Sequence, residues 1–209
     1  MAETTTAPAY RIETQRLVIR CWQPADAPLL KAAIDASLDH LSPWMSWAVG
    51  EQEDVEARVQ HLRQWRASFD RNEDYSYGIW NRAEDAVLGG TGLHTRRGPG
   101  TLEIGYWIHV DHINHGLATE AAAALTRVAF EVNRVHCVEI RNDPANVRSA
   151  AVPRKLGFVH EATLRRRLPS EDGDFRDVRI WSLLDSEYPN SPAAGAEIAA
   201  FDAAGRRIL

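Results

Sequence analysis

Glu103-Ile104-Gly105-Tyr106-Trp107-Ile108, followed after a short loop by Gly116-Leu117-Ala118-Thr119-Glu120, is the stretch that decides the fold of this 209-residue chain. The first run predicts a strand, and the second opens an alanine-rich helix. Free amides at a helix N-terminus carry a partial positive charge, so a strand that leads there through a glycine builds a site for pyrophosphate. We expect the amides of His115 to Thr119 to donate to it. The Glu120 carboxylate would repel a phosphate and must point away.

A second motif follows a further predicted strand. Asn146-x-x-Ser149 opens a predicted helix with Asn146 as its N-cap, and the run Lys155-Leu156-Gly157-Phe158 ends that helix at a glycine. Near the N-terminus, Ile12-x-Thr14-x-Arg16-Leu17-x-Ile19-Arg20 alternates as a strand does. Together these motifs resemble the GNAT N-acetyltransferases, and among them the ribosomal-protein (RimJ/RimL-like) type, over residues 10–185. One departure is Ile113, which stands where the family's phosphate loop commonly has Gln or Arg.

The resemblance implies acetyl-CoA as cofactor. The strand at 103–108 would hold the pantetheine arm, because it splays from the strand at 135–140 and leaves backbone groups unpaired, as a missing strand would require. An N–H near Trp107 or Ile108 would bind the thioester carbonyl. The cofactor contacts that we predict are Trp107, Ile108, Val110, His115, Gly116, Leu117, Ala118, Thr119, Asn146 and Ser149.

Acetyl transfer to an amine requires a neutral amine and a proton or hydrogen bond for the departing thiolate. The resemblance assigns the second role to Ser149. It places a general base at Glu161, with Glu103 on the strand beside the acyl group as the alternative. Burial beside Trp44 or Trp47 would raise the pKa of either carboxylate toward neutrality.

The acceptor is less constrained by the sequence. Trp44 and Trp47 are either core residues or the wall of an acceptor pocket. We expect a protein or peptide N-terminal α-amine, attacked directly on the thioester. The alternatives are a small-molecule amine, another acyl donor such as succinyl-CoA, and a CoA-binding domain without turnover. His109, His112 and His115 do not predict a metal site, because a strand-to-loop segment does not keep a three-residue period on one face.

Periodicity and turn residues define the remaining elements. We predict strands over 10–22, 75–80, 86–94, 102–110, 135–140, 158–167 and 178–184, and helices over 24–38, 54–69, 117–132 and 146–156. Residues 171–174 predict a hairpin turn. Strands with single helices between them favour an α+β fold, in which a mixed, mostly antiparallel twisted sheet carries helices on both faces.

Length and composition limit the remaining classes. The length fits one domain, which we place at 10–185 between a flexible segment at 1–9 and a C-terminal appendage at 186–209. A formal charge of -5 argues against nonspecific nucleic-acid binding, and no apolar run is long enough to span a membrane. The N-terminus lacks the order of a signal peptide, so we expect a cytoplasmic protein, either a monomer or a homodimer.

Overall fold

The computed structural model describes residues 8–50, 53–169 and 174–209, which share one nine-stranded sheet in the order β7-β8-β6-β5-β4-β3-β2-β1-β9. Neighbouring strands are antiparallel except β5 and β6, which are parallel. The strands are β1 (Arg11–Glu13), β2 (Leu17–Cys21), β3 (Tyr75–Asn81), β4 (Val87–His94), β5 (Thr101–Ile108), β6 (Cys137–Asn142), β7 (Val159–Pro169), β8 (Phe175–Leu184) and β9 (Ala199–Phe201). The predicted mixed, mostly antiparallel sheet is confirmed.

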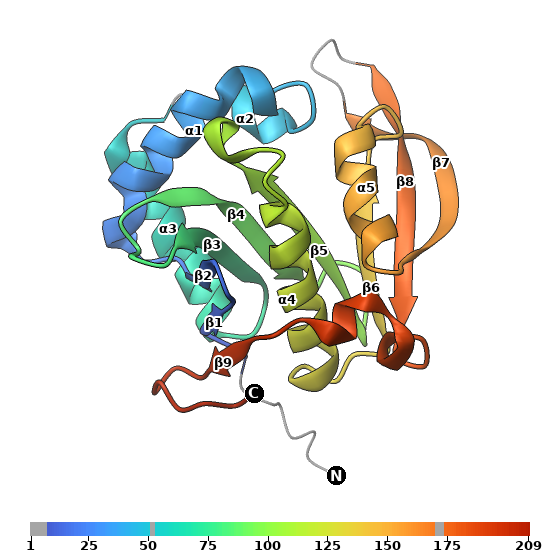
Figure 1. Ribbon diagram of the computed structural model, residues 1–209. Coiled ribbons are helices and arrows are strands. Elements are labelled where there is room, and N and C mark those ends of the chain that lie inside the picture. Colours follow the sequence, from blue (N-terminus) through green and yellow to red (C-terminus); the bar gives the residue numbers. More distant parts are fainter. Residues whose placement is uncertain (1–7, 51–52, 170–173) are drawn as a thin grey trace.

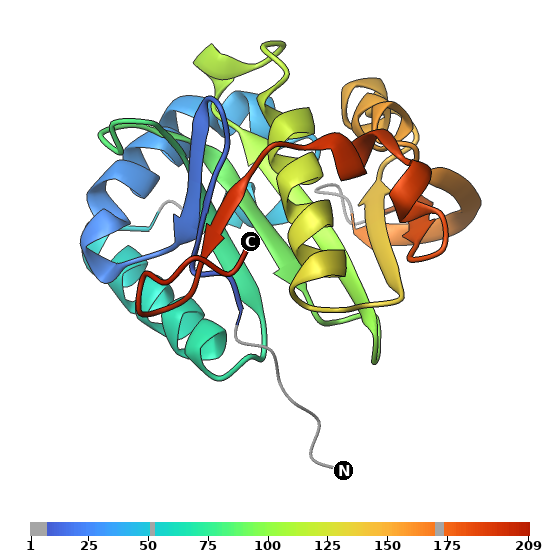
Figure 2. The ribbon, with the colours of Figure 1, turned by 60° about the horizontal axis from the view of Figure 1, so that its bottom comes forward.

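Helices cover both faces of this sheet, as predicted. They are α1 (Ala27–Leu41), α2 (Ser46–Gly50), α3 (Val55–Asp70), α4 (Leu117–Glu131) and α5 (Val147–Lys155). Figures 1 and 2 show α4 and α5 on one side of the sheet and α1 and α3 on the other. Alternating side chains feed two cores: in β2, Ile19 joins the core under α4, and Val18 joins the core under α1.

The sheet is split in its middle, between β5 and β6. Their parallel pairing runs from Thr101 opposite Cys137 to Ile104 opposite Ile140 and ends there. Beyond that point β5 pairs only with β4, and β6 pairs only with β8. The two strands therefore diverge toward their C-terminal ends, with α4 and α5 on either side of the gap (Figure 1). The splay that the family resemblance implies is present.

The N-terminal strand differs from its prediction. Instead of one strand over 10–22, the chain forms a hairpin of β1 and β2. Thr14 makes the turn, because its N–H donates to the Leu17 carbonyl at 3.0 Å and its hydroxyl accepts from the Leu17 N–H at 2.9 Å. Residues 1–7 of the predicted N-terminal segment and residues 171–173 of the predicted hairpin turn lie outside the described residues.

The last 24 residues, which the sequence alone leaves without a position, run back across the domain. β9 pairs with β1 at the sheet edge, and the Phe130 ring of α4 stacks on Tyr188 with 4.7 Å between ring centroids. The Tyr188 hydroxyl donates to Glu131 at 2.5 Å, and Arg127 donates to the Ala196 carbonyl at 2.7 Å. The segment thus supports α4, the helix that opens at the predicted phosphate site (Figure 2).

We predict that this support is energetically significant. Tyr188→Ala removes a stacked, buried ring and should lower the free energy of unfolding by about 3 kcal/mol, whereas Tyr188→Phe loses only the bond to Glu131, worth about 1 kcal/mol. Urea denaturation measures both. As a control, Leu29→Ala truncates a side chain that is 42% exposed and should change stability by no more than about 0.5 kcal/mol. Equal losses for Tyr188→Ala and Leu29→Ala would contradict a supporting role for this segment.

Candidate active site

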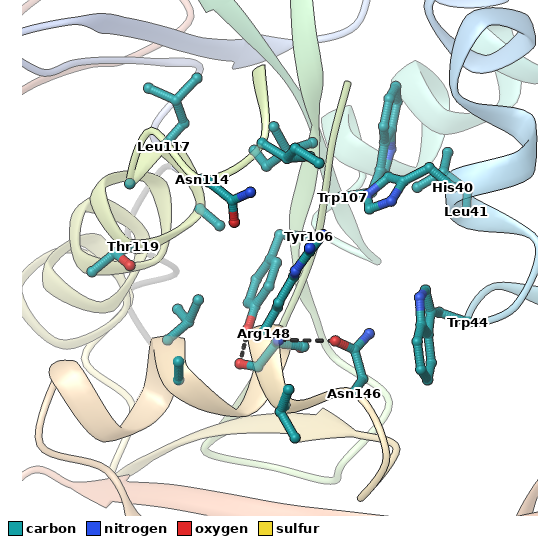
Figure 3. Close-up of a pocket in the computed structure, with 18 of the residues that line it drawn as sticks. His40, Leu41, Trp44, Tyr106, Trp107, Asn114, Leu117, Thr119, Asn146 and Arg148 are labelled. Atoms are coloured by element: carbon teal, nitrogen blue, oxygen red, sulfur yellow. Dashed lines mark hydrogen bonds between the residues drawn. The ribbon is translucent and has the colours of Figure 1, made fainter. Parts of the chain in front are cut away.

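A pocket of about 470 Å³ lies where β5 and β6 diverge. Side chains from α4, α5 and the end of α1 enter it from different sides (Figure 3). Nine of the residues predicted to bind cofactor or substrate line it: Trp44, Trp107, Ile108, Gly116, Leu117, Ala118, Thr119, Asn146 and Ser149. The two motifs that are distant in sequence therefore face each other across one cavity.

The loop before α4 has the backbone shape that the phosphate site needs. Gly116 is the N-cap of α4 with φ of 79°, and Asn114 also lies in the left-handed region with φ of 62°. Beyond its chain neighbours and the backbone of its own helix, the described atom that a Cβ at Gly116 would meet is Arg16 Nη2, at 3.6 Å. Glycine serves here because other residues rarely adopt this conformation. The first amides of α4 thus remain free to meet a ligand.

Glu120 points away from this loop, as the phosphate site requires. Its carboxylate accepts from the Thr14 hydroxyl and from Arg16 Nε, each at 2.6 Å. The same guanidinium donates through Nη1 to the His115 carbonyl at 2.9 Å. Arg16 thereby ties the β1–β2 turn to the start of α4 and keeps the negative charge of Glu120 on the far side. His115 itself is not among the residues that line the pocket.

On the other side of the pocket, Ser149 of α5 and Tyr106 of β5 form a hydroxyl pair. Asn146 caps the helix by accepting from the Ser149 N–H at 3.0 Å. Tyr106 of β5 donates to the Ser149 carbonyl at 3.0 Å, and its oxygen lies 3.2 Å from Ser149 Oγ (Figure 3). Burial raises the pKa of Tyr106, so its hydroxyl stays protonated at neutral pH. Asn146 and Tyr106 therefore hold the backbone of Ser149 at the pocket wall, and Tyr106 also contacts its hydroxyl.

The open edge of β5 borders the same cavity. In the described part of the chain, residues 105–108 have no strand partner on the β6 side. The His109 N–H donates to Leu88 of β4 at 2.8 Å, so strand alternation turns the Ile108 N–H toward the open side. An unpaired strand N–H is the donor that a thioester or amide carbonyl needs.

Two further predicted contacts do not line the pocket. The Val110 N–H donates to the Ser37 hydroxyl of α1 at 3.1 Å. Trp47 is 38% exposed and packs edge-on against Trp107, with 6.3 Å between ring centroids. Trp44 lines the pocket. Of the two tryptophans predicted to form the acceptor wall, Trp44 and Trp47, only Trp44 is therefore part of that wall.

Glu103 lacks the environment expected of a base. It is buried, yet it accepts from Arg96 at 2.5 Å and from Arg97, and Arg141 lies 3.7 Å away. Burial alone would raise the pKa of Glu103, but hydrogen bonds and charges from Arg96 and Arg97 outweigh it and hold that pKa below its usual range. The expected rise in pKa is thus wrong for Glu103. Strand alternation also puts Glu103 on the face of β5 opposite Tyr106.

Glu161 also lies outside the pocket lining. It is exposed, at an irregularity in β7 between His160 and Ala162, and it accepts from the Ser182 hydroxyl at 2.5 Å. Neither Trp44 nor Trp47 buries it. In the described part of the chain, no Asp or Glu lines the pocket.

Several lining residues escape sequence reasoning. They are His40 and Leu41 at the end of α1, Asn114 in the loop, Tyr106 on β5, and Arg148 and Lys155 on α5. Strand alternation predicts Tyr106, because it shares a face with Ile108. Helical spacing groups Arg148 with Lys155. His40 has no comparable signal, since only the fold brings the end of α1 to this cavity.

Two contacts set the electrostatics around the end of α1. Burial, and then the positive charge of Arg148, lower the pKa of His40. Arg176 of β8 donates to the Pro43 carbonyl at 2.5 Å and pairs with Asp143 at 3.1 Å. This arginine holds the segment that carries Trp44 against the start of α5, across the diverging strands.

Among the residues that the structure describes, no three His, Cys, Asp or Glu side chains are grouped to hold a metal ion. No helix there has both the length and the apolar character that crossing a membrane requires.

Known proteins with a similar sequence and fold identify the family of this chain. The model of the acetyltransferase (GNAT) domain family matches residues 16–159. YdaF of Bacillus subtilis, named as a candidate ribosomal N-acetyltransferase, is 27% identical over 175 residues, which are 83% of this chain and 94% of YdaF. RimJ of Mycobacterium smegmatis, solved with a CoA disulfide, superposes with a TM-score of 0.75 at 26% identity, covering 90% of this chain and 91% of RimJ.

A more distant structure shares the fold. RimL, a ribosomal L7/L12 alpha-N-protein acetyltransferase solved with coenzyme A, superposes with a TM-score of 0.74 at 18% identity, covering 82% of this chain and 95% of RimL. The family match spans more than half of the chain and includes both the phosphate loop and the Ser149 helix. The chain therefore belongs to the GNAT family, and it is an acetyl-CoA-dependent N-acetyltransferase.

Proposed function

We propose that this enzyme transfers the acetyl group of acetyl-CoA to the N-terminal α-amine of a protein or peptide by direct attack of the amine on the thioester. The observation that carries the proposal is the gap between β5 and β6, which joins a helix N-terminus capped by Gly116 to the Ser149 hydroxyl within one pocket. That arrangement supports the proposal, because it offers amides to the pyrophosphate, an unpaired strand edge to the pantetheine arm and a hydroxyl to the thioester sulfur.

The cofactor would lie along this gap. Its pyrophosphate accepts from the amides at the start of α4, where the helix dipole favours negative charge. The pantetheine arm pairs with the open edge of β5 beside Tyr106 and Ile108. The thioester sulfur then lies near Ser149, and the acyl group faces the wall formed by Trp44 and Trp107.

In the reaction, the amine nitrogen forms a bond to the thioester carbon and the carbon–sulfur bond breaks. The oxyanion that develops is stabilised by a free N–H on the open edge of β5. The Ser149 hydroxyl donates to the departing sulfur, and Tyr106, bonded to the Ser149 carbonyl, keeps that hydroxyl in position. No covalent enzyme intermediate is needed.

Amine basicity and the charge of the pocket support an α-amine acceptor. An α-amino group has a pKa of about 8 against about 10.4 for lysine, so a larger fraction of it is neutral at pH 7. The described lining contains Arg148 and Lys155 and no carboxylate, which disfavours a strongly basic, cationic side chain. The name of the relative YdaF, a candidate ribosomal N-acetyltransferase, points the same way.

The phosphate site is tested by Gly116→Val. A side chain there stands between the backbone amides and the pyrophosphate, so we expect calorimetry to find CoA affinity reduced at least a hundredfold, about 2.7 kcal/mol. Gly205→Val is the matched control, since Gly205 has φ of 74° in open surroundings and is not among the residues that line the pocket. Unchanged CoA affinity in a folded Gly116→Val variant would contradict the phosphate site.

Leaving-group stabilisation is tested by the hydroxyl pair. Ser149→Ala should lower kcat by roughly one to three decades while the affinity for acetyl-CoA is nearly kept, because the lost bond forms mainly in the transition state. Tyr106→Phe should have a smaller effect, since Tyr106 only positions Ser149. If Tyr106→Phe proves the more damaging change, the donor is Tyr106. A loss confined to KM would assign Ser149 to binding.

The acceptor is tested with matched peptides. One series has a free N-terminus and no lysine, and the other has a blocked N-terminus and a lysine. We expect faster acetylation of the free N-terminus, because more of that amine is neutral at pH 7. Mass spectrometry locates the product. Acetyl groups found mainly on lysine would contradict the assignment, as would turnover of a small amine alone.

A further inference from the structure

The acceptor amine must lose a proton, and the pocket has no carboxylate to take it among its described lining residues. An α-amine arrives mainly as the ammonium at neutral pH, with a pKa of about 8. Glu103 forms ion pairs with Arg96 and Arg97 on the face of β5 opposite Tyr106. Glu161 accepts a hydrogen bond from Ser182 outside the pocket. Another group must therefore accept the proton.

The titratable groups that line the pocket are few: Tyr106, Arg148, Lys155, His40 and His112. The arginine and the lysine are ordinarily protonated and cannot accept a proton. Tyr106 is protonated and bonded to the Ser149 carbonyl, so it accepts a proton no more readily. Only the two histidines combine a position in the pocket with an imidazole, a side chain whose nitrogen can take a proton.

The two histidines come from different elements of the fold. His112 belongs to the short 3-10 helix Val110–His112, directly before the phosphate loop, and its ring lies 5.4 Å from that of His109. His40 lies in the last turn of α1, next to the segment that Arg176 holds over the pocket. In Figure 3, His40 is on the same side of the cavity as Trp44 and Trp107, the wall of the acceptor end.

We propose that His40 is the proton acceptor for the amine: its imidazole nitrogen takes one proton from the ammonium, and the nitrogen lone pair thereby released attacks the thioester carbon. The imidazolium then passes that proton to solvent through the pocket mouth. The second proton, which the nitrogen loses as the C–N bond forms, goes to the departing sulfur through the Ser149 hydroxyl, so the products are the amide and the CoA thiol. This role rests on the acetyl transfer proposed above. It adds a catalytic residue on α1, an element that carries neither of the sequence motifs.

The charges that face His40 keep its imidazole in the neutral form that can accept a proton. Arg148 faces it from α5, with Lys155 farther along that helix, Tyr106 from β5 and His112 from the loop before α4. Burial and the Arg148 charge hold the pKa of His40 below its usual value, so the imidazole is neutral above that pKa and ready to accept. Arg148 also opposes an ammonium nearby, which eases its loss of a proton.

The test is the pH dependence of kcat/KM for a free-N-terminus peptide, compared among the unmodified enzyme, His40→Gln and His112→Gln. With a base present, kcat/KM should be flat between the pKa of His40 and that of the amine, near 8. Without it, the amine must arrive neutral, so kcat/KM of His40→Gln should rise tenfold per pH unit up to about pH 8. At pH 7 we expect a loss of roughly a hundredfold. His112→Gln should keep the flat profile.

Chemical rescue distinguishes a catalytic role of His40 as proton acceptor from a purely structural role of its side chain. Added imidazole should restore activity to His40→Ala and should not restore it to Ser149→Ala. A His40→Gln enzyme with a uniformly lower rate and an unchanged profile would overturn the proposal, as would full activity or absent rescue. Acetyl-CoA affinity, measured by calorimetry, should stay within about twofold in all variants. If the unmodified enzyme acetylates no amine at all, the proposed function itself fails, which differs from failure of the His40 variants alone.

Discussion

The end of strand pairing between β5 and β6 is the constraint on which the rest of the structure depends. The two strands are hydrogen-bonded only as far as Ile104 and Ile140. Beyond them, unpaired strand edges would be costly if they were buried without partners, so the fold leaves a cavity there that a ligand rich in amides can fill. The helix N-terminus at Gly116 and the hydroxyl of Ser149 can act on one ligand only because both border that gap.

Electrostatics complete the arrangement by moving negative charge away from the gap. Glu120 is bound by Thr14 and Arg16 behind the phosphate loop, and Glu103 is bound by arginines on the other face of β5. The cavity keeps Arg148 and Lys155. An anionic cofactor is thereby favoured, and a cationic amine must surrender its proton to react. The same charge distribution that binds the cofactor thus creates the need for a proton acceptor.

Local patterns predicted much of this from sequence. The strand at 103–108, the helix after Gly116 and the Asn146 cap all follow from short-range rules, and the structure has them where the sequence puts them. The predictions that failed have two causes, a local turn between Thr14 and Leu17 and contacts between distant parts of the chain. The turn at Thr14 splits the first strand, and the arginines around Glu103 reach it from the preceding loop and from β6. His40 lines the pocket because α1 packs across β4, and the hydrophobic periodicity of α1 does not predict which strand it contacts.

The central claim is that the cofactor occupies the gap as the missing strand. Amide hydrogen exchange followed by NMR tests it directly, with CoA and ADP as ligands. CoA should protect both the open edge of β5, at Ile108, and the amides at the start of α4, whereas ADP should protect only the amides of α4. Protection of the α4 amides by CoA with no change at Ile108 would show that the arm lies elsewhere. That result would contradict the account of this site.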